Sequence, residues 1–444
     1  KDSNTMFTKE IEKIFPNTTK VIPNKDLEIG GCSLVELANT YGTPLYVFDE
    51  STVRERCKTF IEEFRSRYPE THVAYASKAF INQKLTSILS EEGMGMDVVS
   101  LGEFIAAKQG GMDTSKIHLH GNNKSPEELE YVIGNNIGRI IIDNFDEIEN
   151  LSNIIKSKNC SIKALIRISP GVDPHTHSYI STGILDSKFG FAIETGDAEK
   201  AIKQCLEIDG LDLVGIHCHI GSQIFEIEPY NDAMDISVNF AVNMANNYNF
   251  ILSEISIGGG FAIAYTQNEN PPSVKEYAEI ITNALKNACA SNNIALPKLI
   301  IEPGRAIAGP SGVAIYRVGS IKDIPNIRKY VSVDGGMGDN IRPALYESEY
   351  EAVVLNKINQ ENTEIVTIAG KYCESGDILI KDINLPHIEK DDLICIPASG
   401  AYCIPMSSNY NMNLKPAVIL VQDGKSEIIR KRETYDDILS LEVF

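Results

Sequence analysis

Eight short apolar runs, separated by stretches of helical pattern or loop chemistry, most strongly constrain the fold of this chain. They occupy residues 73–76, 96–99, 117–119, 139–142, 163–168, 213–217, 254–257 and 298–301. Strands that alternate with helices imply right-handed crossovers and a parallel sheet. Eight such units in about 240 residues match the size of a closed (β/α)8 barrel. Periodicity alone leaves an open doubly wound sheet as the alternative.

The residue pattern changes after Gly309, from alternating strands and helices to short β-rich segments. Glycines and turn pairs punctuate short β-rich segments at residues 312–321, 330–334, 351–354, 364–368, 393–397, 417–421 and 427–430. This pattern predicts a C-terminal mainly β domain of sandwich or Greek-key type. A chain of 444 residues is expected to hold two domains. We expect a barrel over residues 48–309, and a mainly β domain, formed by residues 1–47 and 310–444, that completes the active site.

Charge and cysteine usage exclude several classes of partner. The formal net charge is −20, so a nucleic-acid backbone or an anionic membrane surface would be repelled. The sequence has no run of 18 apolar residues and no secretory layout at its start, which indicates a protein of the cell interior. Nine scattered cysteines without a C-x-x-C pair favour a reducing compartment, and we expect the cytoplasm. An organellar location is the alternative, if a transit peptide was removed.

Lys78 ends the first of the eight apolar runs. A helical pattern over residues 83–91 follows it, so the amine is expected where a buried strand opens into a loop. Active sites of parallel barrels collect at these strand ends. An amine in partly dry surroundings there is suited to act as a nucleophile. The alternative is an ordinary surface lysine.

Two motifs at later strand ends are suited to bind charged groups. Gly258-Gly259-Gly260 would let backbone N–H groups approach a phosphate, although a plain tight turn is the alternative. Glu302-Pro303-Gly304-Arg305 places a carboxylate and a guanidinium around a rigid turn, where they could face one ligand or only each other.

Histidines and a thiol form further candidates. His217 and His219 would share a strand face and could ligate a metal, but no acidic or cysteine ligand set accompanies them, and we expect no metal. An imidazole stacked on a cofactor ring and a packed core histidine are the alternatives. Arg342 and Tyr346 lie in a glycine-rich stretch, and Cys373 adjoins the carboxylate of Glu374, although Cys373 could be simply a small buried residue.

Taken in order, these motifs resemble the diaminopimelate decarboxylases, a family of pyridoxal-phosphate enzymes with the alanine racemase fold. The segments that carry the resemblance are residues 75–78, 121–125, 167–177, 187–190, 217–223, 258–260, 302–305, 334–346, 373–377 and 400–402. The similarity runs from about residue 40 to the end of the chain. It departs from the family pattern at residues 261–263, where leucine and glycine are usual, and the first 30 or so residues resemble nothing we can place.

The resemblance implies a role for each residue around the cofactor. Lys78 would hold pyridoxal 5'-phosphate as a Schiff base, and the cofactor would act as the electron sink for a carbanion. Glu302 would pair with the ring nitrogen and His219 would stack on the ring. The phosphate would be held by the remaining residues of the set, namely Ser222, Gly258, Gly259, Gly260, Pro303, Gly304 and Arg305, with Tyr402 nearby.

The resemblance also implies the substrate, meso-2,6-diaminopimelate, and the products, L-lysine and carbon dioxide. Arg305, Arg342 and Tyr346, together with Tyr402, would bind the remote carboxylate, for which a bidentate guanidinium is the natural partner. Glu374 would take the remote ammonium. Cys373 would protonate the substrate carbon, reaching the site from the other subunit, which implies a homodimer with active sites at the subunit interface.

Three other functions remain open on the sequence. A decarboxylase of the same fold could act on ornithine, arginine or carboxynorspermidine, but Arg305, Arg342 and Glu374 would then lack their partners. A racemase would need a second base where Cys373 and Glu374 stand. A non-catalytic regulatory relative would be expected to have lost Lys78 or Cys373.

Overall fold

Two compact units divide the chain in the computed structural model, which describes residues 6–23, 26–175 and 185–444. The barrel unit comprises Arg56–Ala262 and Pro271–Gly304, and the β unit comprises Lys1–Glu55, Ile263–Asn270 and Arg305–Phe444. The sequence motif 167–177 extends into residues outside this description, so Thr176 and His177 are not placed.

Eight parallel strands close the barrel unit. They are β5 (Thr71–Ala76), β6 (Gly95–Val98), β7 (Ile117–Leu119), β8 (Arg139–Ile142), β9 (Ile162–Ser169), β11 (Leu211–His217), β12 (Glu254–Ser256) and β13 (Lys298–Ile301). Their order is β9-β11-β12-β13-β5-β6-β7-β8, and β8 pairs with β9 to complete the circle. The predicted (β/α)8 barrel is confirmed, and the open sheet is excluded. The two-residue strand β10 (Phe191–Ala192) pairs in parallel with the end of β9.

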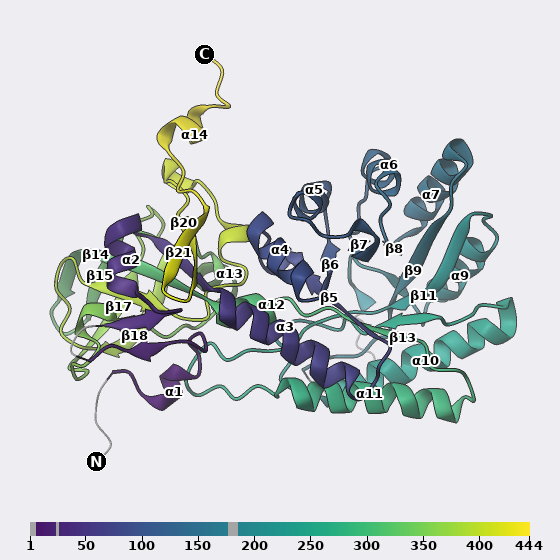
Figure 1. The fold of residues 1–444 in the computed structure, drawn as a ribbon, viewed down its shortest axis with the longest axis horizontal. Helices are drawn as coiled ribbons and strands as arrows, with labels where there is room; N and C mark the ends of the chain where they lie inside the picture. The colour runs from purple at the N-terminus through teal and green to yellow at the C-terminus, as the bar shows by residue number, and fades with distance from the viewer. Residues whose placement is uncertain (1–5, 24–25, 176–184) are drawn as a thin grey trace. The chain divides into compact units, whose positions relative to one another are not determined.

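Helices surround the barrel strands in Figure 1. They are α3 (Glu50–Arg65), α4 (Gln83–Glu91), α5 (Leu101–Gln109), α6 (Pro126–Gly134), α7 (Phe145–Lys158), α9 (Asp197–Leu206), α10 (Glu228–Tyr248) and α11 (Val274–Ser291). Local capping explains several starts. For example, Ser125 and Glu128 form a reciprocal capping box at the start of α6, and Pro126 occupies its first turn. The helix predicted over residues 83–91 is confirmed as α4.

The interior of the barrel contains an apolar cluster and, next to that cluster, a column of buried polar side chains. Ile141, Leu165 and Ile300 pack together from three strands. The polar column consists of Arg139 bound to Glu254 at 2.8 Å, the tilted rings of His72 and His118 with centroids 5.4 Å apart, and the groups described below around Glu302. Buried charges are expensive unless they are paired, so this column is retained at a cost in stability. Buried charges retained at such a cost indicate a functional role.

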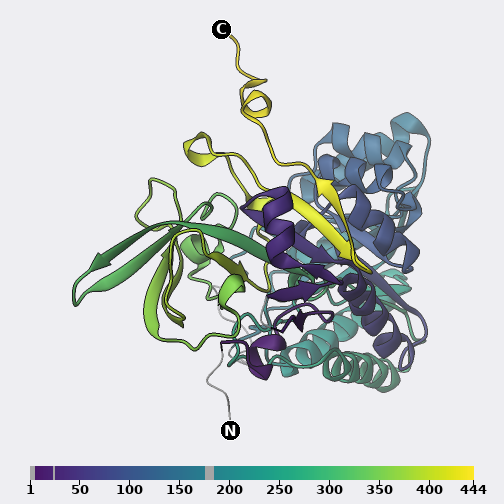
Figure 2. The same ribbon diagram turned by 60° about the vertical axis from the view of Figure 1, so that its left-hand side comes forward.

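The β unit is built around one long strand. Its main sheet has the order β18-β17-β15-β14-β4-β20-β21, with β19 paired to β14 and β16 paired to β19. The strands are β4 (Leu45–Asp49), β14 (Gly312–Ile324), β15 (Arg328–Val333), β16 (Val353–Val354), β17 (Glu364–Ala369), β18 (Ile378–Leu385), β19 (Leu393–Ile396), β20 (Ala417–Gln422) and β21 (Lys425–Arg430). Figure 2 shows β14 and β15 as a long antiparallel hairpin. The predicted mainly β architecture is confirmed.

Shorter elements complete the β unit. A three-stranded sheet contains β1 (Lys20–Val21), β2 (Leu27–Ile29) and β3 (Cys32–Ser33). The helices are α1 (Lys9–Glu12), α2 (Leu34–Tyr41), α12 (Arg305–Ala308), α13 (Arg342–Tyr346) and α14 (Tyr435–Leu439). Two differences from the sequence prediction matter for function. Arg342 and Tyr346 lie on the short helix α13 rather than in a loop, and β18, which the sequence did not predict, begins directly after the Cys373 loop.

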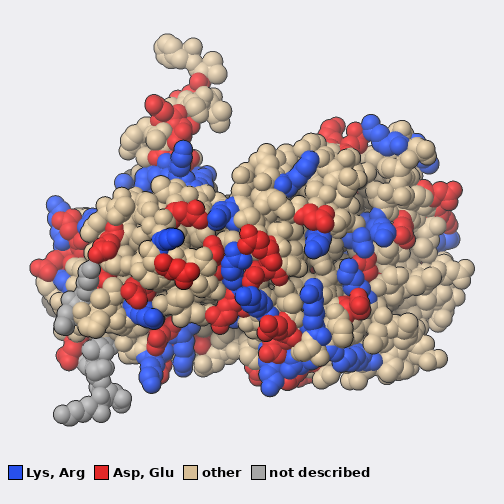
Figure 3. Space-filling view, viewed as in Figure 1, with Lys and Arg blue, Asp and Glu red and all other residues tan. Residues whose placement is uncertain are grey.

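The surface carries charged side chains of both signs. On the face drawn in Figure 3, basic and acidic side chains are interspersed, without a continuous basic field. Over the described ranges, none of the helices has both the length and the apolar composition that a membrane crossing requires.

Candidate active site

A cavity of about 670 Å³ lies in the barrel unit and is lined by residues from the C-terminal ends of the strands. Lys78 lines it from the short turn η1 (Ser77–Ala79), which follows β5 directly. The flanking Ser77 and Ala79 are buried, whereas the Lys78 side chain is exposed. The amine is therefore at the strand end that the sequence indicates, but in a more open setting than the partly dry one we expected.

Glu302 lies in the cavity with a hydrogen-bonding partner at each of its carboxylate oxygens. It follows β13, is only 7% exposed, and both its oxygens are occupied: Oε1 lies 2.9 Å from His217 Nε2, and Oε2 accepts a hydrogen bond from Ser256 Oγ at 2.7 Å. Burial alone would raise the pKa of Glu302, but the facing histidines and these two hydrogen bonds hold it well below its ordinary value. Glu302 is thus a fixed, ionised carboxylate.

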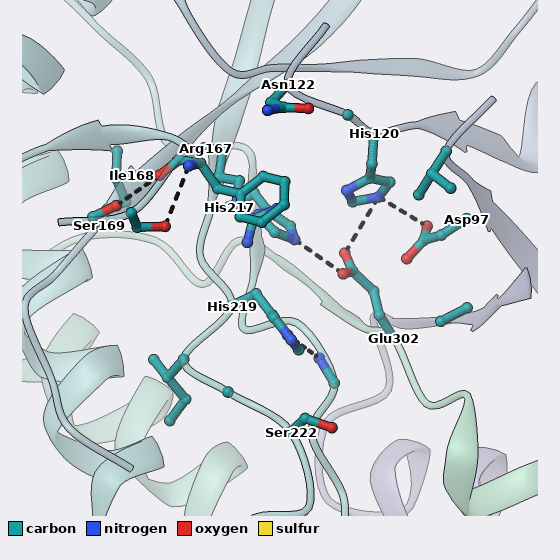
Figure 4. Close-up of a pocket in the computed structure, with 18 of the residues that line it drawn as sticks. Asp97, His120, Asn122, Arg167, Ile168, Ser169, His217, His219, Ser222 and Glu302 are labelled. Carbon is teal, nitrogen blue, oxygen red and sulfur yellow. Dashed lines mark hydrogen bonds and ion pairs between the residues drawn. The ribbon is translucent and has the colours of Figure 1, made fainter. Parts of the chain in front are cut away.

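Asp97 and His120 face the same carboxylate. His120 Nε2 lies 3.3 Å from Asp97 Oδ1 and 3.9 Å from Glu302 Oε2, as Figure 4 shows. Burial, together with the charge of Glu302, raises the pKa of Asp97 well above its ordinary value, and burial lowers that of His120 well below. Of the two carboxyl groups, Glu302 therefore favours the ionised form more than Asp97 does.

The glycine turn contacts His219. The Gly259 amide donates a hydrogen bond of 3.3 Å to His219 Nδ1, which fixes the imidazole (Figure 4). Burial, and then the Lys78 ammonium, lower the pKa of His219 well below its ordinary value, so the ring is neutral. A Cβ on Gly259 would lie 2.2 Å from the Glu302 carbonyl oxygen. Only glycine fits there, so the turn can lie close against the backbone that follows β13.

The rest of the glutamate motif packs against the lysine turn. The Pro303 carbonyl accepts a hydrogen bond of 3.0 Å from the Ala76 amide, and a Cβ on Gly304 would lie 2.9 Å from the Ala76 carbonyl oxygen. This close packing fixes the backbone of β5 and of the residue after β13 relative to each other. It holds the strand ends that carry Lys78 and Glu302 at a set spacing.

Two guanidiniums gather in the β unit. Arg342 Nη1 donates a hydrogen bond of 2.6 Å to the Tyr350 hydroxyl, and its Cζ lies 4.5 Å from the centre of the Tyr265 ring. Arg305 donates to the Tyr265 hydroxyl and lies 4.7 Å above the Tyr402 ring. The predicted Arg305, Arg342 and Tyr402 are therefore brought together by Tyr265, whereas Tyr346, at the end of α13, is 60% exposed.

The thiol and its neighbouring carboxylate lie on an exposed loop of the β unit. Cys373 is the exposed member of the nine free cysteines, and its amide donates to Asn411 Oδ1 at 2.7 Å. Buried Asp377 fastens this loop to the one that leads to Arg342, because its oxygens accept from the amides of Met337 at 2.7 Å and Tyr372 at 3.0 Å. Cys373 and Glu374 are thus presented to solvent on a firmly held turn.

Sequence reasoning missed several of these groups. Asp97 lies within β6 and His120 directly follows β7, so the rule that directed us to Lys78 could have found both. Tyr265 and Tyr350 carried no such signal, because neither stands in a recognisable motif. Their roles depend on contacts between segments far apart in the sequence.

The metal pair considered from the sequence is wrong in its geometry. β11 ends at His217, so His219 lies beyond the strand, and its ring is bonded to Gly259. In the described parts of the chain, the group with metal-like spacing is His120, His217 and Glu302, whose ligand atoms lie within 4.8 Å of one another. The cluster consists of the hydrogen bond between His217 and Glu302 together with His120, whose Nε2 lies 3.9 Å from Glu302 Oε2.

The arrangement can bind a particular kind of small molecule. The barrel cavity offers an amine for a carbonyl, an ionised carboxylate for a cationic ring nitrogen, a neutral imidazole and a glycine turn for a phosphate. The β unit offers a pair of guanidiniums for a carboxylate.

Residues 50–309 match the family model of the pyridoxal-dependent decarboxylases, pyridoxal binding domain. Over 94% of its length, the chain is 46% identical to the diaminopimelate decarboxylase of Bacillus subtilis, covering 95% of that protein. It is 44% identical to the diaminopimelate decarboxylase of Synechocystis over 96% of the chain and 92% of that protein.

Solved structures agree. The diaminopimelate decarboxylase of M. jannaschii, also solved in co-complex with L-lysine, superimposes with a TM-score of 0.91 at 35% identity, covering 96% of this chain and 98% of that one. The enzyme of Helicobacter pylori, complexed with L-lysine, gives a TM-score of 0.82 at 32% identity, covering 92% and 98%. The chain belongs to the diaminopimelate decarboxylase family of pyridoxal-dependent decarboxylases.

Proposed function

We propose that this chain decarboxylates meso-2,6-diaminopimelate to L-lysine and carbon dioxide, the last step of lysine biosynthesis. The observation that carries the proposal is the state of Arg342. Its side chain is 7% exposed, and within the described residues no carboxylate lies at ion-pair distance from it. A buried guanidinium that is bound only by phenols keeps its charge available for an incoming anion.

The barrel cavity fits pyridoxal phosphate. The cofactor has an aldehyde, a basic ring nitrogen and a phosphate, and the cavity provides an amine, an ionised carboxylate and a glycine turn that a Cβ would block. Lys78 would bind the aldehyde, Glu302 the protonated ring nitrogen, and His219 would pack on the ring. Ser222 and the turn 258–260 would hold the phosphate, with Gly304 and Tyr402 completing its surroundings.

Pyridoxal phosphate, when bound, supplies the electron sink for the pair of electrons left by departing carbon dioxide. Glu302 would keep the ring nitrogen protonated, and the contacts with His217 and Ser256 favour the charged form of this carboxylate. The low pKa of Glu302 maintains that charge down to acidic pH. The raised pKa of Asp97 disfavours a second negative charge beside it.

The β unit would select the substrate. Arg305 and Arg342, with Tyr346 at the end of α13, would bind the carboxylate that is retained in lysine, and Glu374 would bind the remote ammonium. Cys373, exposed on its loop, would deliver the proton that replaces carbon dioxide. We propose that this thiol acts in the site of a second copy, so the working form is a homodimer. The nine free cysteines suit a reducing compartment, and we place the enzyme in the cytoplasm.

Turnover assays test the substrate directly. Protein and pyridoxal phosphate are mixed with meso-diaminopimelate, ornithine, arginine or carboxynorspermidine, and carbon dioxide and the amine product are quantified. We expect turnover of diaminopimelate at least about 10⁴-fold above the others, because substrates without the second carboxylate leave Arg342 unpaired. Preferred turnover of ornithine or arginine would replace this function by the alternative decarboxylase. Absence of turnover with all four would favour the regulatory relative.

A further inference from the structure

We propose that Tyr265 is a positioning residue that holds Arg305 and Arg342 as one anion-binding pair and thereby sets the preference for a substrate with a second carboxylate. This inference rests on the proposed function and concerns a residue that neither the sequence motifs nor the cofactor requires. All of the contacts involved lie within the β unit.

Tyr265 contacts the two arginines with different parts of its side chain. Its hydroxyl accepts a hydrogen bond from Arg305 Nη1, and its ring face lies 4.5 Å from Arg342 Cζ. A single phenol therefore bridges two guanidiniums that come from α12 and α13, far apart in the sequence. With 4% of its surface exposed, Tyr265 makes both contacts away from bulk water, where such interactions are stronger.

The phenol is itself fixed. The Tyr265 ring meets the Tyr350 ring edge to face, with centroids 5.4 Å apart at 79°. The Tyr265 amide donates to Glu269 Oε1 at 3.0 Å, and the Thr266 amide donates to the same oxygen at 3.0 Å. Tyr265 thus has one available orientation, and the two guanidiniums are placed by it.

A phenol can hold two like charges close together because it offers a hydroxyl to one and a ring face to the other. Two guanidiniums repel each other, and burial adds the cost of desolvation. A carboxylate between them would remove both costs but would also occupy the anion site. Aromatic faces stabilise a cation without themselves occupying an anion site. Tyr265 under Arg342 and Tyr402 under Arg305 satisfy this condition.

The experiment uses Tyr265→Phe, which removes the hydroxyl, and Tyr265→Leu, which also removes the aromatic face. Tyr41→Phe is the matched control, since its hydroxyl bonds to Ser426 Oγ at 2.8 Å in the same unit and its contact with Arg432 is made by the backbone carbonyl, which the substitution keeps. Each holoenzyme is titrated with L-lysine, which keeps the remote carboxylate, and with 1,5-diaminopentane, which lacks it. Kinetic constants for meso-diaminopimelate, cofactor content and thermal unfolding are measured in parallel.

We expect lysine affinity to fall about tenfold in Tyr265→Phe and about 100-fold in Tyr265→Leu, with unchanged affinity for 1,5-diaminopentane. KM should rise by the same factors while kcat stays within about threefold, because binding of the remote group is lost equally in the ground and transition states. Cofactor content should not change, and Tyr41→Phe should match the wild type. Should Tyr265→Leu fail to fold, Tyr265→Phe decides alone.

A lysine-to-diamine preference that stays at the wild-type value in a folded Tyr265 variant overturns the inference, as does an equal loss of both ligands. The proposed function is tested separately, by the measurements on the wild-type protein. If wild-type protein neither turns over diaminopimelate nor prefers lysine to the diamine, the substrate assignment is wrong whatever the variants do. An active wild type with insensitive variants removes only the role of Tyr265.

Discussion

The imidazole of His217 and the carboxylate of Glu302 form a buried pair, with Nε2 and Oε1 2.9 Å apart. Because Ser256 takes the second oxygen, at 2.7 Å, the carboxylate is held from both sides. This arrangement fixes both the position and the ionisation of the group that we assign to the cofactor's ring nitrogen. It is the structural basis for the first prediction.

Replacing Glu302→Gln should lower kcat by at least about 10²-fold, because a preorganised charge that faces the reacting system is lost. Cofactor content, measured by absorbance, should stay near stoichiometric. Ser256→Ala removes one hydrogen bond to a charged group and should lower kcat by about tenfold or somewhat more. The exposed Glu194→Gln serves as the control. A Glu302→Gln enzyme with the wild-type rate would show that the carboxylate is not the partner of the ring nitrogen.

Gly259→Ala should weaken cofactor binding by at least about tenfold, because its Cβ would lie 2.2 Å from the Glu302 carbonyl oxygen and the turn would have to move. Titration of the apoprotein with pyridoxal phosphate measures the effect. Gly134→Ala, at the end of α6 with no atom within 4 Å of the added carbon, is the matched control. Equal cofactor affinities for the two variants would place the phosphate elsewhere.

Cys373→Ala should leave the cofactor in place and slow lysine formation by about 10²-fold, since the proton that replaces carbon dioxide loses its donor. Single-turnover kinetics separate this step from substrate binding. The control is Cys160→Ala, a half-buried thiol of the barrel unit. An unaltered rate in Cys373→Ala would rule out the thiol as proton donor.

His72, in the polar column of the barrel, should make the fold sensitive to acid. Burial, and next the charge of Lys298, lower its pKa to about 4 from 6.5. The unfolded chain therefore binds a proton between these values while the folded chain does not, so this stability is present above pH 6.5 and is lost as the pH falls towards 4. Relative to His72→Phe, the wild type should lose up to about 3 kcal/mol of unfolding free energy over that range.

Urea unfolding of both proteins at several pH values between 4 and 7.5 measures this difference. The exposed His387→Gln should follow the wild type throughout. If the gap between the wild type and His72→Phe stays constant with pH, His72 titrates alike in the folded and unfolded chains.

The barrel could be predicted from the sequence because each of its strands is buried on both faces and is therefore a short apolar run, as residues 139–142 illustrate. β18 escaped prediction because Lys381, Asp382 and Asn384 interrupt its apolar pattern, and its pairing with β17 is a long-range property. The helix α13 was hidden for a similar reason, since five residues that include a proline are too few to give a helical period.

The residues of the candidate site also fall into two groups, those in local sequence motifs and those placed by long-range contacts. Lys78, Glu302 and the glycine triplet stand at strand ends in motifs, so sequence alone identified them. Tyr265 owes its position to contacts with residues 40 and 77 positions further along the chain, which no local pattern reports. The same holds for Asp97, whose raised pKa depends on the facing Glu302.

The most direct test of the account is to find where the cofactor is attached. Holoenzyme reduced with borohydride and digested should yield one pyridoxyl-modified peptide, with the group on Lys78, and Lys78→Ala should yield none while the exposed Lys84→Ala behaves as the wild type. A pyridoxyl group on another lysine, or an undiminished cofactor linkage in Lys78→Ala, would contradict the assignment on which the proposed chemistry depends.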